Sequence, residues 1–158
     1  MSLRPVALPP QVPGQLWLAS MPGRFEAWSA FEAQAKGAGL ALVVCLTSRD
    51  EVAELSPDYH AAVTQGRVPF RWIAVPMPNF GLPDDRTAFR RQVDEIAQAV
   101  RQGDAVLLHC AAGIGRTGST AACVLKALGL GTEDALQRVR DAGSNPQNAQ
   151  QSGLVDWF

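Results

Sequence analysis

One ten-residue segment organises this sequence: His109-Cys110-Ala111-Ala112-Gly113-Ile114-Gly115-Arg116-Thr117-Gly118. The apolar run before it, 105–108, predicts a buried strand. The run after it, 119–128, is rich in alanine and leucine and predicts a helix. A glycine-rich turn between a strand and a helix N-terminus binds anions, because backbone N–H groups and the positive end of the helix dipole converge there. The segment therefore predicts an anion-binding loop.

This loop carries a cysteine at its start and an arginine near its end. The helix N-terminus and Arg116 favour the thiolate form of Cys110. The guanidinium of Arg116 can hold two oxygens of a phosphate in a planar fork. Small residues between them let the backbone approach that phosphate closely. The predicted phosphate-binding residues are Ala111, Ala112, Gly113, Ile114, Gly115 and Arg116, and no metal or other cofactor is required.

The same string resembles the signature of cysteine-based protein phosphatases, His-Cys, five residues, then Arg-Ser/Thr, and it matches at His109, Cys110, Gly113, Arg116 and Thr117. The resemblance is to the protein tyrosine phosphatase superfamily, in its compact dual-specificity class, and covers most of the chain. It implies a phosphomonoester hydrolase with a phosphocysteine intermediate on Cys110. Sulfur transfer and arsenate reduction also use such a loop, but the string fits phosphatases better and no resolving cysteine pair follows.

Composition is that of an ordinary globular protein: 158 residues, 47% hydrophobic, 18% charged, net charge −1. We expect one phosphatase-like domain over 15–158, preceded by a proline-rich extended segment over 1–14. The near-neutral charge disfavours nucleic acid or an anionic membrane as partner. Three cysteines without close spacing indicate a reducing compartment, so we expect a cytoplasmic protein. The oligomeric state stays open, and a monomer is compatible with the sequence.

Strands and helices are predicted to alternate along the chain. The expected strands are 15–19, at a sheet edge, 40–46, 70–75 and 105–108; the expected helices are 25–36, a short one through 55 with N-cap candidates at 47–50, one from 57, 84–102, 119–128, 132–142 and one from 146. This order predicts an α/β fold with a mainly parallel central sheet of four to five strands and helices on both faces. Ligands bind such sheets at the carboxyl ends of the strands, where the loop lies.

The segment 75–84 resembles the mobile loop that carries the general acid in this superfamily. Pro78, Phe80, Gly81 and Pro83 match its pattern, but Asn79 stands where the family has the catalytic aspartate. An amide cannot protonate a leaving oxygen. Loss of general acid catalysis costs about 10²–10⁴ in rate.

Three explanations of Asn79 remain open. Asp84 or Asp85 supplies the proton, although both also suit the start of the helix that follows. Alternatively, the substrate has a leaving group that needs little help. In the third, Asn79 makes the protein a phosphate-binding interaction module with weak turnover. The expected substrate in the first two is a phosphorylated protein or a small phosphomonoester.

The resemblance also implies supporting residues. Thr117 would donate a hydrogen bond to the thiolate, and His109 would lie behind the loop with its ring nitrogens bonded to backbone. A glutamine-bearing segment in related phosphatases positions the hydrolytic water; Gln150 and Gln147 are the candidates here, with a helix cap the favoured role for Gln147.

Two further cysteines are predicted to lie in the core. Cys45 could pair with Cys110 on oxidation, as in some relatives, but a plain core thiol is favoured. Cys123, in the helix after the loop, is expected to be a core residue.

Overall fold

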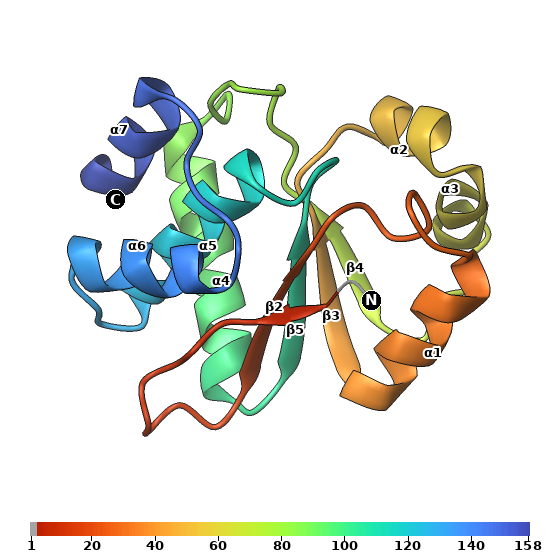
Figure 1. The fold of residues 1–158 in the computed structure, drawn as a ribbon, viewed down its shortest axis with the longest axis horizontal. Coiled ribbons are helices and arrows are strands. Elements are labelled where there is room, and N and C mark those ends of the chain that lie inside the picture. Colours follow the sequence, from red (N-terminus) through yellow and green to blue (C-terminus); the bar gives the residue numbers. More distant parts are fainter. Residues whose placement is uncertain (1–2) are drawn as a thin grey trace.

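A computed structural model describes residues 3–158 of the chain (Figure 1). Its five-stranded sheet has the order β1-β2-β5-β3-β4. Neighbours among β2, β5, β3 and β4 pair in parallel, whereas β1 pairs antiparallel with β2. The strands are β1 (Arg4–Pro5), β2 (Gln15–Ala19), β3 (Leu40–Cys45), β4 (Arg71–Ala74) and β5 (Ala105–His109). The mainly parallel sheet is confirmed.

Helices cover both faces of this sheet, as predicted (Figure 1). One layer consists of α1 (Trp28–Ala38), α2 (Arg49–Leu55) and α3 (Pro57–Thr64). The other consists of α4 (Arg86–Arg101), α5 (Gly115–Ala127), α6 (Thr132–Asp141) and α7 (Ala149–Trp157). Among residues 3–158, no helix is both long enough and apolar enough to cross a membrane.

Strand β5 is buried on both sides, which explains its unbroken apolar sequence. Because side chains alternate along a strand, Val106 and Leu108 pack in the core beneath α4–α7. Leu107 faces the opposite way and packs with Phe31 of α1. The central strand is thus held from both layers, and its end, where the loop begins, has a fixed position.

The structure departs from the predictions at several places. Helix α1 begins at Trp28 instead of residue 25, and α5 begins at Gly115 instead of residue 119, within the loop segment. Strand β2 lies inside the sheet, because Arg4–Pro5 adds the short outer strand β1. Helix α6 is preceded by Gly131 as its N-cap, and Thr132 is its first helical residue. Helix α7 begins at Ala149, where Asn148 caps it by accepting a hydrogen bond from the Gln151 N–H. Residues 1 and 2 of the expected N-terminal segment lie outside the described residues.

Candidate active site

The loop between β5 and α5 wraps around the sulfur of Cys110, and this residue is only 3% exposed. The sulfur accepts hydrogen bonds from the Gly113 N–H at 3.2 Å and from the Thr117 hydroxyl at 3.0 Å. Gly113 has φ 76°, and a Cβ there would come within 2.5 Å of the Ala19 backbone. Only glycine fits this turn, because it must adopt positive φ and touch the end of β2.

A cavity of about 330 Å³ opens over this loop. Its lining comprises the loop residues Cys110, Ala111, Ala112, Gly115 and Arg116, together with Arg24, Glu51, Leu55, Asn79, Phe80 and Gln147. Gly113 and Ile114, also predicted to bind phosphate, are not among its lining residues. A larger open hollow, of about 540 Å³, lies near Trp17 and Gln34 and is lined by no nucleophilic or titratable side chain.

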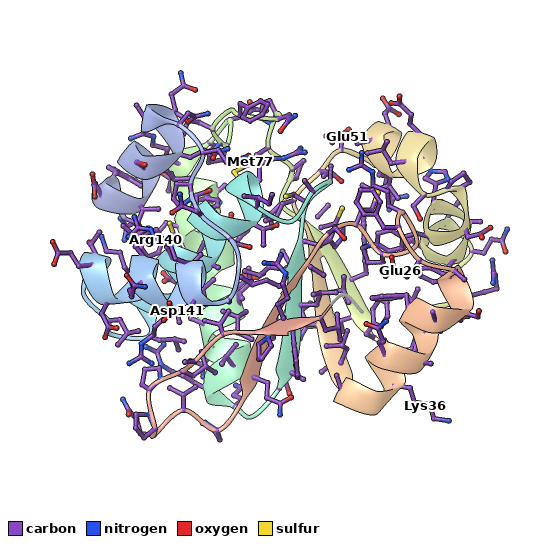
Figure 2. All side chains as sticks on the ribbon, in the orientation of Figure 1. Glu26, Lys36, Glu51, Met77, Arg140 and Asp141 are labelled. Carbon is purple, nitrogen blue, oxygen red and sulfur yellow. The ribbon has the colours of Figure 1, made fainter. Side chains whose placement is uncertain are left out.

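Arg116 is held by the carboxylate of Glu51, which no motif in the sequence indicates. Its two terminal nitrogens donate to the two oxygens of Glu51, at 2.8 and 2.9 Å. One of them also donates to the Met77 carbonyl at 3.0 Å. Figure 2 shows Glu51 and Met77 at the end of the molecule where the parallel strands finish. Burial has the largest single effect and lowers the pKa of Arg116, but the hydrogen bonds with Glu51 and the interactions with Cys110 and the Glu51 charge together raise the pKa above its ordinary value.

Glu51 was missed because its local pattern has a simpler explanation. It stands three residues after Ser48, as in a capping box, and its N–H donates to the Ser48 hydroxyl at 3.1 Å. The carboxylate, however, is bonded to Arg116 instead of closing the box. The N-cap candidates at 47–50 include the observed cap, Ser48, but give no signal of a partner for Glu51 that lies 65 residues away.

We expect Glu51→Gln to lower kcat/KM for an aryl phosphate about 10-fold. The amide keeps the shape but loses one charge-assisted hydrogen bond and the charge that aligns the guanidinium. Steady-state kinetics and the inhibition constant of inorganic phosphate measure the effect. Tighter phosphate binding in the variant would instead show that Glu51 competes with the ligand for Arg116.

His109 ends a directed chain of buried hydrogen bonds beneath the loop. Trp72 donates from its indole N–H to the Tyr59 hydroxyl at 2.7 Å. That hydroxyl lies 2.8 Å from His109 Nε2, and His109 Nδ1 lies 3.1 Å from the Cys110 carbonyl. A carbonyl only accepts, so Nδ1 carries the proton and Nε2 accepts from Tyr59. The prediction of two backbone partners was therefore half right.

The free energy of unfolding should decrease as the pH falls, because His109 is buried and neutral in the folded protein. Burial lowers the pKa of His109 from 6.5 to about 4. Below pH 6.5 the unfolded chain takes up a proton that the folded chain takes up only near pH 4. The free energy of unfolding should therefore decrease by roughly 3 kcal/mol as the pH is lowered from 6.5 to 4. Urea titrations at several pH values, on the native protein, His109→Asn and the control His60→Gln, measure this dependence. Only His109→Asn should lose that part of the pH dependence. An unchanged pH profile in His109→Asn would refute the assignment.

Asn79 lines the cavity on a tight turn. The Gly81 N–H donates to the Pro78 carbonyl at 2.9 Å, and Phe80 has φ 59°. A non-glycine residue in this region is strained, and such strain gathers at binding sites. The Asn148 side chain donates to the Phe80 carbonyl at 2.9 Å, which ties the turn to the start of α7. The position predicted for the general acid is therefore at the cavity, with an amide side chain.

The two aspartates named as alternative acids lie outside that cavity lining. Asp85 is the N-cap of α4, and its Oδ1 accepts from the N–H groups of Thr87 and Ala88 at 2.9 and 3.1 Å. Asp84, beside it, is exposed. The capping role of Asp85 is thus present in the structure, while a catalytic role for either residue stays a prediction.

Two glutamines lie against the loop, but Gln150 is not one of them. Gln150 is exposed and does not line the cavity, whereas Gln147 does. Gln151, 1% exposed, accepts from the Gln147 N–H at 2.7 Å, and its Nε2 has no hydrogen-bond partner among the described residues. A Cβ on Gly115 would come within 2.5 Å of Gln147 Oε1 and 2.8 Å of Gln151 Oε1. The spacing of four between these glutamines was the signal available in the sequence.

The other cysteines lie in the core as free thiols. The Cys45 sulfur lies 3.2 Å from the Thr47 hydroxyl, and burial raises the pKa of Cys45. Burial also raises the pKa of Cys123 to about 12. Neither thiol has the surroundings of a nucleophile. Within 3–158, no group of three or more His, Cys, Asp or Glu residues could hold a metal ion.

Comparisons with known proteins agree with this geometry. A family model described as the DSP-PTPase phosphatase domain of Swiss Army Knife proteins matches residues 11–152. A 56-residue part of the chain is 48% identical to Tyrosine-protein phosphatase 1 of Caenorhabditis elegans. That match covers 31% of this chain and 5% of the nematode protein, so it concerns only a small part of that protein.

Solved structures share the fold at low sequence identity. A variant of kinase associated phosphatase, whose catalytic cysteine is replaced by serine, superposes with a TM-score of 0.82 at 20% identity, over 97% of this chain and 90% of that one. The human tyrosine phosphatase-like serine/threonine/tyrosine-interacting protein gives 0.69 at 19%, over 93% and 91%. TpbA of P. aeruginosa gives 0.64 at 21%, over 98% and 90%.

Proposed function

The chain belongs to the DSP-PTPase phosphatase domain family, and from this premise we propose that it hydrolyses phosphomonoesters through a phosphocysteine intermediate on Cys110. The observation that carries the proposal is the pair of donors on the Cys110 sulfur, from Gly113 and Thr117, at the floor of the cavity that Arg116 also lines. Two hydrogen bonds and a nearby cation stabilise a thiolate, and only the thiolate is a nucleophile.

In the first step the thiolate attacks phosphorus, an S–P bond forms, and the P–O bond to the leaving group breaks. Arg116 and the N–H groups of the loop stabilise the equatorial oxygens, where charge is spread in the transition state. The leaving oxygen takes a proton from solvent or from an acid near the cavity. The products of this step are the alcohol or phenol and phosphocysteine.

In the second step water attacks phosphocysteine, the S–P bond breaks and inorganic phosphate leaves. Thr117 and the Gly113 N–H stabilise the departing thiolate. Gln151 supports this step, because its buried Nε2 lacks a partner beside the loop and can bind the water. Gln147, which lines the cavity itself, shares that role.

The proposed substrates are phosphorylated proteins, with a tyrosine or dual-specificity preference, or small phosphomonoesters. An acid-quenched reaction with an aryl phosphate tests the mechanism. Mass spectrometry should find a phosphoryl group on the peptide that contains Cys110, and free phosphate should appear in proportion to enzyme and time. Turnover without modified Cys110, and unaffected by alkylation of that cysteine, would overturn the proposal.

A second function is favoured by one observation, the amide of Asn79 at the cavity. With no acid there, the domain would hold a phosphorylated protein and turn it over slowly. Calorimetric binding of a phosphopeptide, measured beside its hydrolysis, separates the two functions. A complex that outlasts many expected turnovers supports the binding module, whereas rapid release of phosphate supports the enzyme.

A further inference from the structure

An arginine from the N-terminal strand reaches the back of the phosphate-binding loop. Arg4, in β1, donates from Nη2 to the Gly113 carbonyl at 2.6 Å. Its Nη1 donates to the Ala142 carbonyl at 2.7 Å and to the Ser144 hydroxyl at 3.1 Å. Ser144 in turn donates to the same Gly113 carbonyl at 2.6 Å. Arg4 lies outside residues 11–152, the part of the chain that the family model matches.

The surrounding residues fix the backbone of Arg4 and leave space for its side chain. The backbone of Arg4 is fixed because Arg4 pairs with Leu18 in the sheet. Two residues further on, the side chain of Val6 is buried in the core and holds the segment in place. The guanidinium lies over Gly143, where a Cβ would come within 2.7 Å of Nη1. A glycine at 143, with φ 89°, therefore leaves the space that the half-buried arginine fills.

The Gly113 carbonyl matters because Gly113 also supplies the N–H that donates to the Cys110 sulfur. Glycine has wide conformational freedom, so contacts from outside the loop must fix this residue. We propose that Arg4 is a positioning residue for the reaction: by holding the Gly113 carbonyl, it keeps the loop in the shape in which its N–H groups face the sulfur and the phosphate.

Arg4 also brings positive charge to the back of the loop. Burial lowers the pKa of Arg4, and the charge of Cys110 raises it, so the two groups interact through space. Arginine remains charged in proteins. Its planar fork fixes two acceptors at once, whereas the flexible ammonium group of lysine holds an acceptor less rigidly. The inference rests on the proposed function only in that Cys110 is taken as the nucleophile.

Arg4→Gln and Arg4→Lys test the proposal. We measure the rate of Cys110 alkylation by iodoacetamide as a function of pH, with the modified peptide identified by mass spectrometry, and kcat/KM for an aryl phosphate. Arg4→Gln should shift the alkylation profile to higher pH and lower kcat/KM by about 10- to 100-fold, as expected for a charge-assisted hydrogen bond. Arg4→Lys should recover part of both effects because it keeps the charge.

Arg138→Gln is the matched control. Arg138, in α6, also holds the N-terminal segment by donating to the Ala7 carbonyl at 3.0 Å. Its other partner is Asp134 of the same helix, and not the loop. If Arg4→Gln acts through the loop, Arg138→Gln keeps the native profile and kcat/KM. Equal losses in both variants, or an Arg4→Gln protein within twofold of native in both readouts, overturn the proposal.

One of the two readouts separates the inference from the proposed function. Alkylation reports on Cys110 without any turnover, so a protein that fails to hydrolyse aryl phosphates still shows whether Arg4 sets the reactivity of the thiol. If Arg4→Gln does not fold, as judged by its thermal melt, Arg4→Lys decides: a partial loss in both readouts supports the proposal, and native values of both in that variant overturn it.

Discussion

Replacing Cys110 by serine is expected to abolish turnover while phosphate binding is retained. The serine hydroxyl is the same shape but stays protonated at neutral pH, so it cannot attack phosphorus in place of a thiolate. Removal of a catalytic nucleophile costs on the order of 10⁶ in kcat in well-studied hydrolases. Arg116 and the loop N–H groups are untouched by the change and continue to hold the anion. Kinetics with an aryl phosphate and calorimetry with inorganic phosphate measure the two properties.

Cys45→Ser is the matched control for this substitution. Cys45 is also a buried thiol, and its hydrogen-bonding neighbour Thr47 accommodates a hydroxyl. We expect that variant to keep native kcat/KM. Residual turnover in Cys110→Ser similar to that of Cys45→Ser would remove Cys110 from the mechanism.

The sheet and its helices were predictable because each local pattern agreed with the global fold. The run through β5 is apolar at every residue before His109, since both faces of the strand are buried. The start of α4 was predictable from Asp85, whose short side chain suits an N-cap. Strand β1 was not predictable: Arg4–Pro5 pairs only because β2 offers an unpaired edge, which no local pattern reveals.

The positions of Cys110 and Arg116 in one loop were predictable from one segment, but their partners were not. Glu51, Tyr59 and Arg4 reach the loop from three other elements. Each has an ordinary local role, in a capping box, on a short helix or in a proline-rich segment. Their contact with the loop depends on tertiary packing, which spacing along the chain does not encode. Gln150 and Gln151 are adjacent in the sequence and differ in which side of α7 they occupy, so spacing alone does not tell that Gln151 is the buried one.

Changing Asn79→Asp is expected to raise turnover of substrates with poor leaving groups by about 10²–10⁴. Asparagine and aspartic acid have the same size, so the strained turn at Phe80 and its contact with Asn148 should survive. The new carboxyl would lie at the cavity that holds Cys110 and could protonate the leaving oxygen, which is the contribution expected of a positioned general acid. For an aryl phosphate with a very acidic phenol the gain should be small, because that leaving group departs without a proton.

A series of aryl phosphates of rising phenol pKa measures this difference. In the native protein, rates should fall steeply along the series, and in Asn79→Asp they should become nearly flat. The variant should also lose activity as pH rises, because its acid must be protonated to act. A native protein that is already fast and insensitive to the leaving group would show that another group donates the proton. Asp84→Asn and Asp85→Asn would then identify it: the acid is the residue whose replacement makes the rate depend steeply on the leaving group. Asparagine still caps a helix, so Asp85→Asn keeps the start of α4 and a changed slope reports on proton donation.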